Sequence, residues 1–242
     1  MAPIEAGRNA RIAVISDTHA NILALDAALR DIHTAGVDSI IHLGDAIGFG
    51  PRPAECLDRL LTTRSLIQLM GNHDSWCIKG DAGPGKPAGI MDHLGWTWAQ
   101  VNPAHRDSME NWPYCLDMDA HGFHAVFQHY ALDTSGKDFQ EIKRPPSRDL
   151  YDSMFGRPEA RAVFFGHDHI PSDTAGPPCR YLDPGSLGTG PDPVVRLLLV
   201  TFNGGAMTVE PRAVPCDREP LWQDFEDLKV PGRTEIRTRF FT

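Results

Sequence analysis

Seven side chains that can bind a metal stand in short polar segments of this 242-residue chain. They are carboxylates, imidazoles and one amide, namely Asp17, His19, Asp45, Asn72, His129, His167 and His169. Oxygen and nitrogen donors without a thiolate favour Mn, Fe, Zn, Co or Ni. Seven ligands are too many for one tetrahedral ion. The set therefore predicts two divalent transition-metal ions that share one carboxylate.

The spacing of two ligand pairs supports a common site. Asp17 and His19 lie two positions apart, and so do His167 and His169. Alternate residues of an extended chain point to the same side, so each pair can face one ion. Taken singly, an Asp beside a turn or a lone His129 has an ordinary structural explanation. Their joint occurrence in one order along the chain favours the metal site.

Each polar segment follows an apolar run that is typical of a buried strand. These runs cover residues 11–16, 39–43, 65–70, 123–128 and 162–165. Asn21 can cap a helix that stops near Gly36, and Pro53 suits the first turn of another helix. The alternation of strand, polar segment and helix predicts an α/β fold with the ligands at the carboxyl ends of the strands.

Composition predicts the remaining segments. We expect a loop over residues 79–89 and two short helices over 90–112. Residues 131–161 are expected to form surface loops with one helix. Asn203-Gly204-Gly205 between two apolar runs, 194–202 and 207–213, predicts a β-hairpin. The residues after about 214 give no clear pattern.

Charge and composition exclude several classes of protein. With 32 acidic against 23 basic residues the net charge is −9, which repels nucleic-acid backbones, so we expect no nonspecific nucleic-acid binding. A phosphate substrate is compatible with this charge because bound metal ions reverse it locally. We expect no membrane span and no signal peptide, because no apolar run is long enough. Five scattered cysteines without a CxxC pair predict a reduced, cytoplasmic protein.

The ligand segments resemble the calcineurin-like metallophosphoesterase superfamily. The five matching blocks stand in the family's order: DTH (17–19), GD (44–45), GNHD (71–74), His129 and GHDH (166–169). The stretches GDAIGFGP (44–51) and DPGSLG (183–188) are similar to the small bacterial and archaeal phosphodiesterase branch that includes the YfcE-like proteins. The resemblance implies a single domain, 1–242, folded as a four-layer α/β/β/α sandwich. Residues 75–116 would then wall the active site.

The resemblance also implies a role for each candidate residue. The first ion would be held by Asp17, His19, Asp45 and His169, and the second by Asp45, Asn72, His129 and His167. Two ions about 3.5–4 Å apart can hold a hydroxide that attacks a phosphoryl group in line. His73 would contact the phosphate and, as general acid, protonate the leaving oxygen. Manganese is the ion we expect first, ahead of Fe, Zn, Ni or Co.

Three positions refine this resemblance. Gly48 stands where the phosphoprotein phosphatases of the superfamily usually carry an aspartate that orients the catalytic histidine. Asp183 stands where relatives often have Asn, and we interpret it as a turn residue outside the site. Arg52 either approaches a phosphate or belongs to a tight turn that leads into a helix. Among the other histidines, His42 is interpreted as a core residue.

The sequence therefore predicts a phosphoester hydrolase that depends on two metal ions. The expected activity is that of a phosphodiesterase or of a nucleotide hydrolase of the dinucleoside polyphosphate type, acting on a small phosphoester or nucleotide. One alternative is a phosphomonoesterase or protein phosphatase. The other is a metal-binding scaffold without catalysis, which the presence of His73 and all seven ligands disfavours. The oligomeric state is not readable from the sequence.

Overall fold

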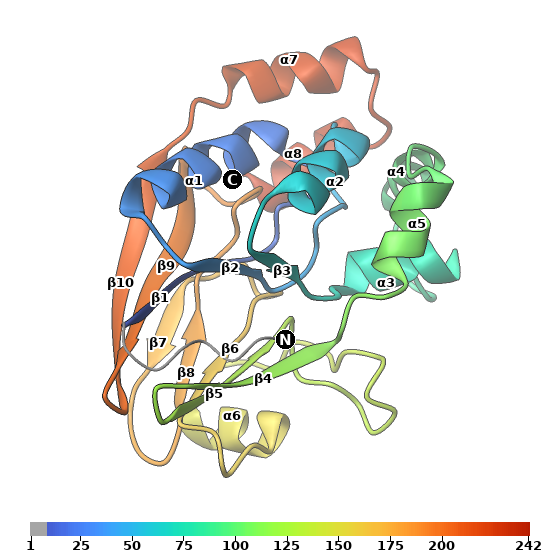
Figure 1. Cartoon of the computed structure of the whole chain (residues 1–242). Helices are drawn as coiled ribbons and strands as arrows, with labels where there is room; N and C mark the ends of the chain where they lie inside the picture. Colours follow the sequence, from blue (N-terminus) through green and yellow to red (C-terminus); the bar gives the residue numbers. More distant parts are fainter. Residues whose placement is uncertain (1–8) are drawn as a thin grey trace.

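The computed structural model describes residues 9–242, and its strands form two five-stranded mixed sheets (Figure 1). In the first sheet three parallel strands are flanked by an antiparallel hairpin. Its order is β10 (Ala206–Pro215), β9 (Val194–Asn203), β1 (Ala10–Ile15), β2 (Ser39–His42) and β3 (Leu66–Gln68). The predicted hairpin around Asn203-Gly204-Gly205 is confirmed as β9 and β10.

The second sheet also has a parallel centre, with one antiparallel strand at each edge. Its order is β4 (Cys115–Ala120), β5 (Phe123–Gln128), β6 (Ala162–Phe164), β8 (Arg180–Asp183) and β7 (Ser172–Thr174). The sequence predicted β5 and β6 but missed the other three strands. The miss at β4 is instructive, because Leu116, Met118 and Ala120 alternate with aspartates, the period of a half-buried strand.

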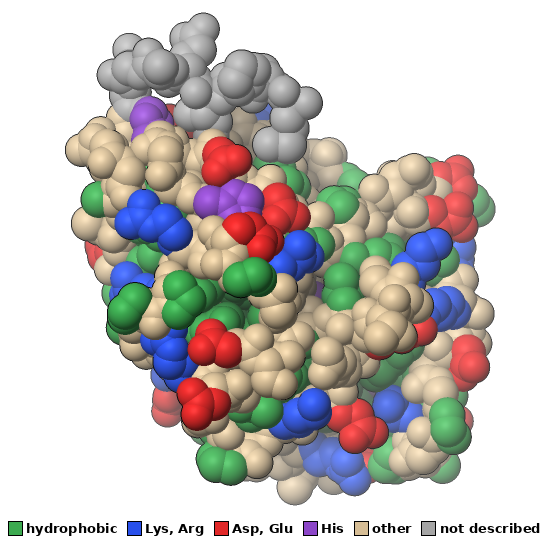
Figure 2. Space-filling model, turned by 90° about the horizontal axis from the view of Figure 1, so that it is seen from below, with side chains coloured by type: hydrophobic (Ala, Val, Ile, Leu, Met, Phe, Trp, Pro, Cys, Tyr) green, Lys and Arg blue, Asp and Glu red, His purple; other side chains and the backbone are tan. Residues whose placement is uncertain are grey.

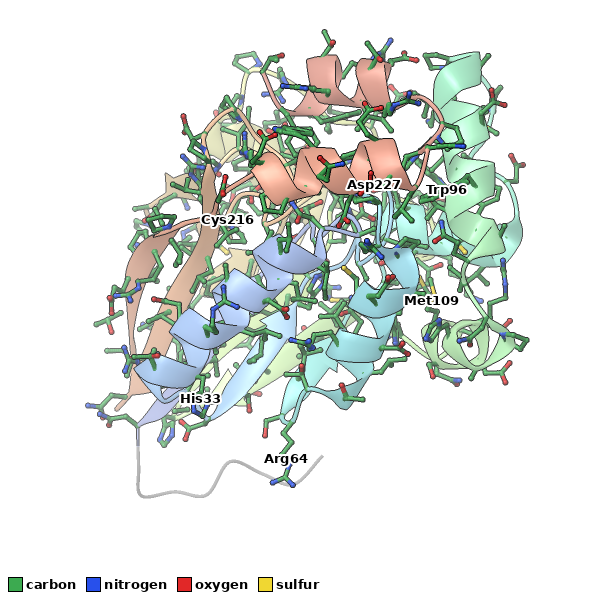
Figure 3. All side chains as sticks on the ribbon, turned by 90° about the horizontal axis from the view of Figure 1, so that it is seen from above. His33, Arg64, Trp96, Met109, Cys216 and Asp227 are labelled. Atoms are coloured by element: carbon green, nitrogen blue, oxygen red, sulfur yellow. The ribbon has the colours of Figure 1, made fainter. Side chains whose placement is uncertain are left out.

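The helices cover both outer faces of the sheet pair. They are α1 (Ile22–Ala35), α2 (Pro53–Thr62), α3 (Asn72–Lys79), α4 (Ala88–Ala99), α5 (Pro103–Met109), α6 (Arg148–Phe155), α7 (Glu219–Asp227) and α8 (Arg233–Phe240). Figures 1 and 3 show α1, α2, α7 and α8 on the outer side of the first sheet, and Figure 1 shows α6 beneath the second. The predicted four-layer α/β/β/α sandwich is confirmed.

Three apolar clusters hold these layers together. Between the sheets, side chains such as Val14, Val200 and Phe127 form a fully buried cluster. A second cluster joins α1 and α2 to the first sheet, and a third joins α6 to the second sheet. Burial of this apolar surface is the main stabilising contribution to such a sandwich, and it fixes the strand ends that carry the candidate ligands.

The local signals at the helix ends act as the sequence predicts. The Asn21 side chain accepts a hydrogen bond from the Ala24 N–H at 3.1 Å, and Gly36 ends α1 in the left-handed conformation. Pro53 opens α2, and the two short helices expected over 90–112 are α4 and α5. The sequence analysis missed α3, α7 and α8. No helix within residues 9–242 has the length and apolar character to cross a membrane. Residues 1–8, part of the stretch in which we expect no signal peptide, lie outside the described residues.

Candidate metal centre

The seven predicted ligands meet at one edge of the two sheets. Asp17 and His19 follow β1, Asp45 follows β2, Asn72 begins α3 after β3, His129 follows β5, and His167 and His169 follow β6. Parallel strands end at the same edge of a sheet, which is why segments so far apart in the sequence converge. We call these seven residues the ligand cluster.

The backbone turns sharply at most members of the ligand cluster. Five of the seven have a positive φ, at 54° for Asp17, 45° for His19, 58° for Asp45, 72° for His167 and 61° for His169. Residues other than glycine adopt this conformation at a cost of about 1–3 kcal/mol each, and such residues concentrate at functional sites. The turns aim the side chains across the edge of the sheets instead of along the strands.

Main-chain hydrogen bonds continue past the strand ends and fix the first two ligand segments to each other. The Asp17 N–H donates to the Gly44 carbonyl at 3.0 Å, and the His19 N–H donates to the Asp45 carbonyl at 2.9 Å. Across the sandwich, the His167 N–H donates to Asp17 Oδ2 at 3.1 Å. Segments from both sheets are therefore joined directly at the ligand cluster.

One group within the cluster consists of Asp17, His19 and His169. The Nε2 atoms of the two histidines lie 2.9 Å apart, and they lie 3.6 Å and 3.3 Å from Asp17 Oδ1. The Thr189 hydroxyl is 2.9 Å from His169 Nδ1 and holds that ring in place. A hydrogen bond at Nδ1 leaves the Nε2 lone pair free for a metal.

The other group consists of Asp45, Asn72, His129 and His167. His129 Nε2 lies 3.4 Å from Asp45 Oδ2 and 2.9 Å from Asn72 Oδ1. Donor atoms of Asp45, His129 and His167 all lie within 4.8 Å of one another. Asp45 Oδ2 is also 3.7 Å from His19 Nε2. The Asp45 carboxylate thus lies between the two groups, as a bridging ligand must.

Burial and charge make the cluster attractive to cations. Burial would raise the pKa of Asp17 and Asp45, but the imidazoles around them outweigh it and hold both pKa values well below the ordinary value. Burial would lower the pKa of His129, but Asp45 and then Asp17 raise it to about 9. Burial and then His129 lower the pKa of His167 to about 3. Two ionised carboxylates are therefore buried among imidazoles.

Divalent ions fit this donor set. Asp17 Oδ1 is fully buried, accepts no hydrogen bond, and faces the Nε2 atoms of His19 and His169. A buried carboxylate oxygen without a partner is costly unless a cation or a donor compensates it. Asp17, His19, Asp45 and His169 could hold one ion, and Asp45, Asn72, His129 and His167 a second one.

His73 lies beside the cluster, on the first turn of α3. Its main-chain N–H donates to Asp45 Oδ1 at 2.8 Å, and its Nδ1 is buried without a partner. The rings of Phe49 and Trp76 pack against it, each with 4.6 Å between ring centroids. Burial holds the pKa of His73 well below the ordinary value. Packing against these rings is what orients the imidazole in this chain.

Gly48 is a position where the backbone allows no side chain. Its φ is 145°, and a Cβ would lie 2.5 Å from His19 Nδ1 and 3.0 Å from His73 Nδ1. Its carbonyl accepts hydrogen bonds from His93 Nε2 and from the Thr97 hydroxyl of α4. The aspartate that this position carries in phosphoprotein phosphatases therefore has no room here.

Asp74 is a residue that the sequence analysis did not assign to the site. It is fully buried, and its Oδ2 accepts from the N–H groups of Asp45 at 2.8 Å and Gly71 at 3.0 Å. Its Oδ1 accepts from the Ile47 N–H at 3.3 Å. Burial and then the charge of Asp45 raise the pKa of Asp74 to about 7. The Asp74 carboxylate thus joins the segments that follow β2 and β3. In the sequence, only its place directly after His73 indicated that it belongs to the site.

Three other interpretations can be compared with the structure. Arg52 turns away from the cluster, because its guanidinium pairs with Asp224 through bonds of 2.6 Å and 3.1 Å; of its two possible roles, the turn is the one observed. His42 is fully buried, and its Nε2 lies 2.8 Å from the Thr18 hydroxyl, in keeping with a core residue. Asp183 Oδ1 accepts from the Gly185 N–H at 2.7 Å, which is the geometry of a turn.

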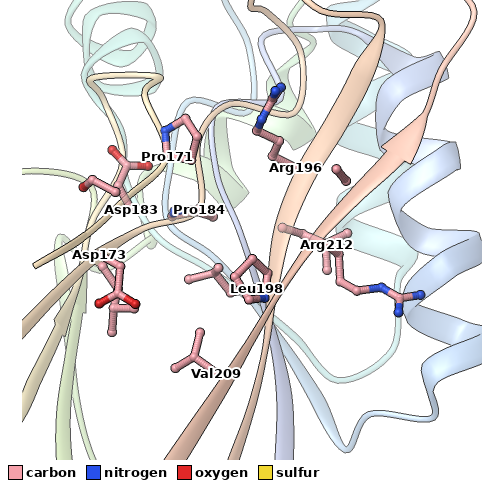
Figure 4. Close-up of a pocket in the computed structure, with 13 residues that line it drawn as sticks. Pro171, Asp173, Asp183, Pro184, Arg196, Leu198, Val209 and Arg212 are labelled. Atoms are coloured by element: carbon pink, nitrogen blue, oxygen red, sulfur yellow. The ribbon is translucent and has the colours of Figure 1, made fainter. Parts of the chain in front are cut away.

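Two cavities of the described residues differ in whether members of the ligand cluster line them. A cavity of about 300 Å³ between β7, β8 and the β9–β10 hairpin is lined by Asp183, Arg196 and Arg212 (Figure 4). It contains no member of the ligand cluster. A cavity of about 450 Å³ is lined by two members, Asn72 and His167. Substrate access to the cluster is therefore available from the second cavity.

Known proteins resemble this chain in sequence and in fold. An uncharacterized protein of Methanocaldococcus jannaschii, MJ0912, is 30% identical over 161 residues, which cover 66% of this chain and 63% of that relative's length. The crystal structure of a metallophosphoesterase from Sphaerobacter thermophilus matches with a TM-score of 0.73 at 24% identity, covering 96% and 98% of the two chains. That of hypothetical protein PH1004 from Pyrococcus horikoshii OT3 matches with a TM-score of 0.79 at 19% identity, covering 94% and 97%.

A sandwich of two mixed sheets with buried carboxylates and imidazoles at its strand ends defines a metallophosphoesterase. The sequence profile of the calcineurin-like phosphoesterase superfamily domain matches residues 11–204. The chain belongs to this superfamily, and the resemblance noted from its motifs is confirmed. The match ends before β10, α7 and α8.

Proposed function

We propose that the protein is a phosphodiesterase or a nucleotide hydrolase of the dinucleoside polyphosphate type that uses two divalent transition-metal ions. The observation that carries this proposal is the position of Asp45, whose carboxylate lies 3.7 Å from His19 and 3.4 Å from His129. Each of these histidines belongs to a different donor group. Oxygen and imidazole donors suit manganese first, and Fe, Zn, Ni or Co as alternatives.

The residues of the site divide the work of hydrolysis. When bound, two ions activate water and neutralise the negative charge of the phosphoryl group. The buried ligand cluster fixes their positions, and the bonds from Asp74 to the Asp45 segment keep the shared carboxylate in place. His73 gives a proton to the leaving oxygen. Burial lowers its pKa, so this role requires the negative charge of the bound phosphate to raise that pKa again. Phe49 and Trp76 hold its ring toward the substrate.

Diesters or nucleotide anhydrides are the substrate class that we favour over phosphoproteins. Gly48 leaves no room for the aspartate of the phosphoprotein phosphatases, since a Cβ there would lie 2.5 Å from His19 Nδ1. The alternative activity is that of a phosphomonoesterase or protein phosphatase. The alternative from another class is a noncatalytic metal-binding scaffold, which does not require a buried imidazole such as His73 beside the cluster.

A hydrolysis screen tests the proposal directly. Purified protein with Mn²⁺ is offered bis-p-nitrophenyl phosphate, p-nitrophenyl phosphate, dinucleoside polyphosphates and a phosphopeptide. We expect a higher kcat/KM for the diester or the dinucleoside polyphosphates than for the phosphopeptide. A clear preference for the phosphopeptide would favour the protein phosphatase. Protein that binds two metals and hydrolyses none of these compounds would favour the scaffold.

The cellular setting is part of the same proposal. All five cysteines are free, as in proteins of the reducing cytoplasm. The face seen from below in Figure 2 intersperses acidic, basic and apolar side chains. This mixture, together with the net charge of −9, supports a small phosphoester or nucleotide as partner and not a nucleic-acid coat.

A further inference from the structure

The cavity of about 450 Å³ beside the ligand cluster has aromatic as well as polar walls. Asn72 and His167 of the ligand cluster line it, and Trp76, Phe139 and Lys86 are among the other lining residues. The volume lies in the range of small-molecule pockets, about 300–1,000 Å³. A group attached to a phosphate at the ligand cluster can therefore extend into this cavity, which we call the aromatic cavity.

Trp76 connects the aromatic cavity to the proposed general acid. It lies one turn after His73 on α3, with 4.6 Å between the centroids of the two rings. The Lys86 ammonium lies 4.5 Å from the centroid of the Trp76 ring. The ammonium lies over one face of this half-buried indole, so a base that stacks on that face must displace it.

Phe139 lines the aromatic cavity from the loop that follows β5. Its ring packs edge-on against His129, with 5.3 Å between centroids and 81° between planes. An isolated β-bridge to Leu132 and a 2.8 Å hydrogen bond from the Gln140 N–H to the Ala131 carbonyl hold the loop that carries it. Phe139 is therefore a positioned wall of the cavity, held against a member of the ligand cluster.

Charges around the aromatic cavity select against a strongly anionic occupant. Lys86 is the one cation among the lining residues, which also include Asp138 and Glu141. The Asp138 carboxylate is in an ion pair with Lys79, and Glu141 is exposed at the rim. A neutral planar group fits such walls better than a second dianionic phosphate or an acidic peptide.

We infer that the aromatic cavity binds the nucleoside part of the substrate, with the base against Trp76 and Phe139. This inference rests on the proposed phosphoesterase function and narrows its substrates to nucleotide esters or anhydrides. Stacking of a base on aromatic side chains strengthens binding by roughly 10-fold or more per base. The ligand cluster holds the phosphate, and the cavity distinguishes nucleotides from simple alkyl phosphates.

Binding of two probes that differ only by a base tests the inference. Isothermal titration calorimetry in Mn²⁺ measures the Kd of AMP and of ribose 5-phosphate, and this measurement does not depend on turnover. Wild-type protein is expected to bind AMP at least about 10-fold more tightly. Trp76→Leu and Phe139→Leu should each reduce this ratio at least about three-fold, because a general effect on phosphate binding would change both Kd values alike and leave the ratio as it is. A wild-type ratio near one, or a ratio unchanged in both variants, would overturn the inference.

Matched variants separate the cavity from general effects. Trp96→Leu alters a half-buried tryptophan of α4 that does not line the cavity (Figure 3), and it should leave the ratio unchanged. Lys86→Gln should weaken both probes, whereas Lys137→Gln on the exposed loop should weaken neither. Hydrolysis of bis-p-nitrophenyl phosphate without a preference for AMP would refute the subsite and leave the proposed function standing. Preference for AMP without any hydrolysis would refute the function and leave the subsite standing.

Discussion

Aromatic rings cover one side of the ligand cluster, and a cavity opens on the other. On the covered side, Phe49 packs on His19 at 4.7 Å and stacks on Phe240, with 3.7 Å between the ring centroids. On the open side, Asn72 and His167 line the cavity of about 450 Å³. The same donors are thus presented in two environments, one packed by the protein itself and one able to receive a ligand.

The two sides of the ligand cluster are also built from different segments of the sequence. The open side is built from α3 and the segments after β5 and β6, all within the matched residues 11–204. The cover includes α8, which lies beyond that match and is tied back by a 2.7 Å hydrogen bond from the Gly190 N–H to the Phe240 carbonyl. The covered side therefore depends on a helix outside the matched residues, and the open side does not.

The largest expected effect comes from the carboxylate between the two sides. Asp45→Asn should weaken both metal positions, because Oδ2 faces His19 and His129 alike. Removal of metal with a chelator should likewise abolish activity. His19→Ala removes a ligand from the covered side only, so its loss of metal and activity should be smaller.

Elemental analysis of the purified variants measures this difference. Wild-type protein should hold two metals per chain in saturating Mn²⁺, and Asp45→Asn should lose more metal than His19→Ala. At most one tightly bound metal in the wild type would contradict the bridging role of Asp45.

The next effect concerns the proton given to the leaving group. If His73 is the general acid, His73→Ala should lower kcat by roughly 10²–10⁴ for an alkyl or nucleoside leaving group. Nitrophenolate leaves readily as an anion, so the loss should be smaller for nitrophenyl esters. Both metals should remain bound, because we assign His73 to the leaving oxygen and not to a metal. Equal losses on both kinds of substrate would indicate phosphate binding instead of proton transfer.

The ligand cluster was the part of the site that the sequence predicted best. Runs of apolar, β-branched residues defined β1, β2, β3, β5 and β6, and the polar residues that follow them gave all seven cluster members. For Asp74 the sequence offered only its place directly after His73, because its partners are main-chain N–H groups up to 29 positions away. Such contacts depend on the fold and leave no pattern of side chains.

The sequence analysis missed α8, which forms part of the aromatic cover, for a different reason. In α8 only Ile236 is buried, and charged residues occupy much of the helix, so no apolar periodicity marks it. Packing on neighbouring elements stabilises such a helix more than its own sequence does. Phe49, Leu94 and Phe225, from three separate segments, share a buried cluster with Ile236 and Phe241. Only the tertiary structure reveals this cover.

A smaller loss of metal affinity is expected when Asp74, which accepts hydrogen bonds from the segments of Asp45 and Gly71, is replaced. Asp74→Ala leaves the N–H groups of Asp45 and Gly71 without their shared acceptor. Loss of an outer partner of a metal ligand typically costs about 10–100-fold in metal affinity or activity. Titration of activity with Mn²⁺ should show this loss, whereas Asp92→Ala on the exposed surface of α4 should not. A Mn²⁺ titration identical to that of wild type would refute the role of Asp74 as a positioning residue.

The smallest effect tests the cover itself. Phe240→Leu keeps most of the apolar area but removes the stack on Phe49, and aromatic pairs contribute about 0.5–1.5 kcal/mol beyond area burial. For a chain of this size, the melting temperature should fall by roughly 2–5 °C. Phe49→Leu should cost more, because that ring also packs on His19 and His73. If the two rings act together, the double variant should lose less stability than the sum of the single losses. Strictly additive losses would mean that Phe240 does not support the covered side through Phe49.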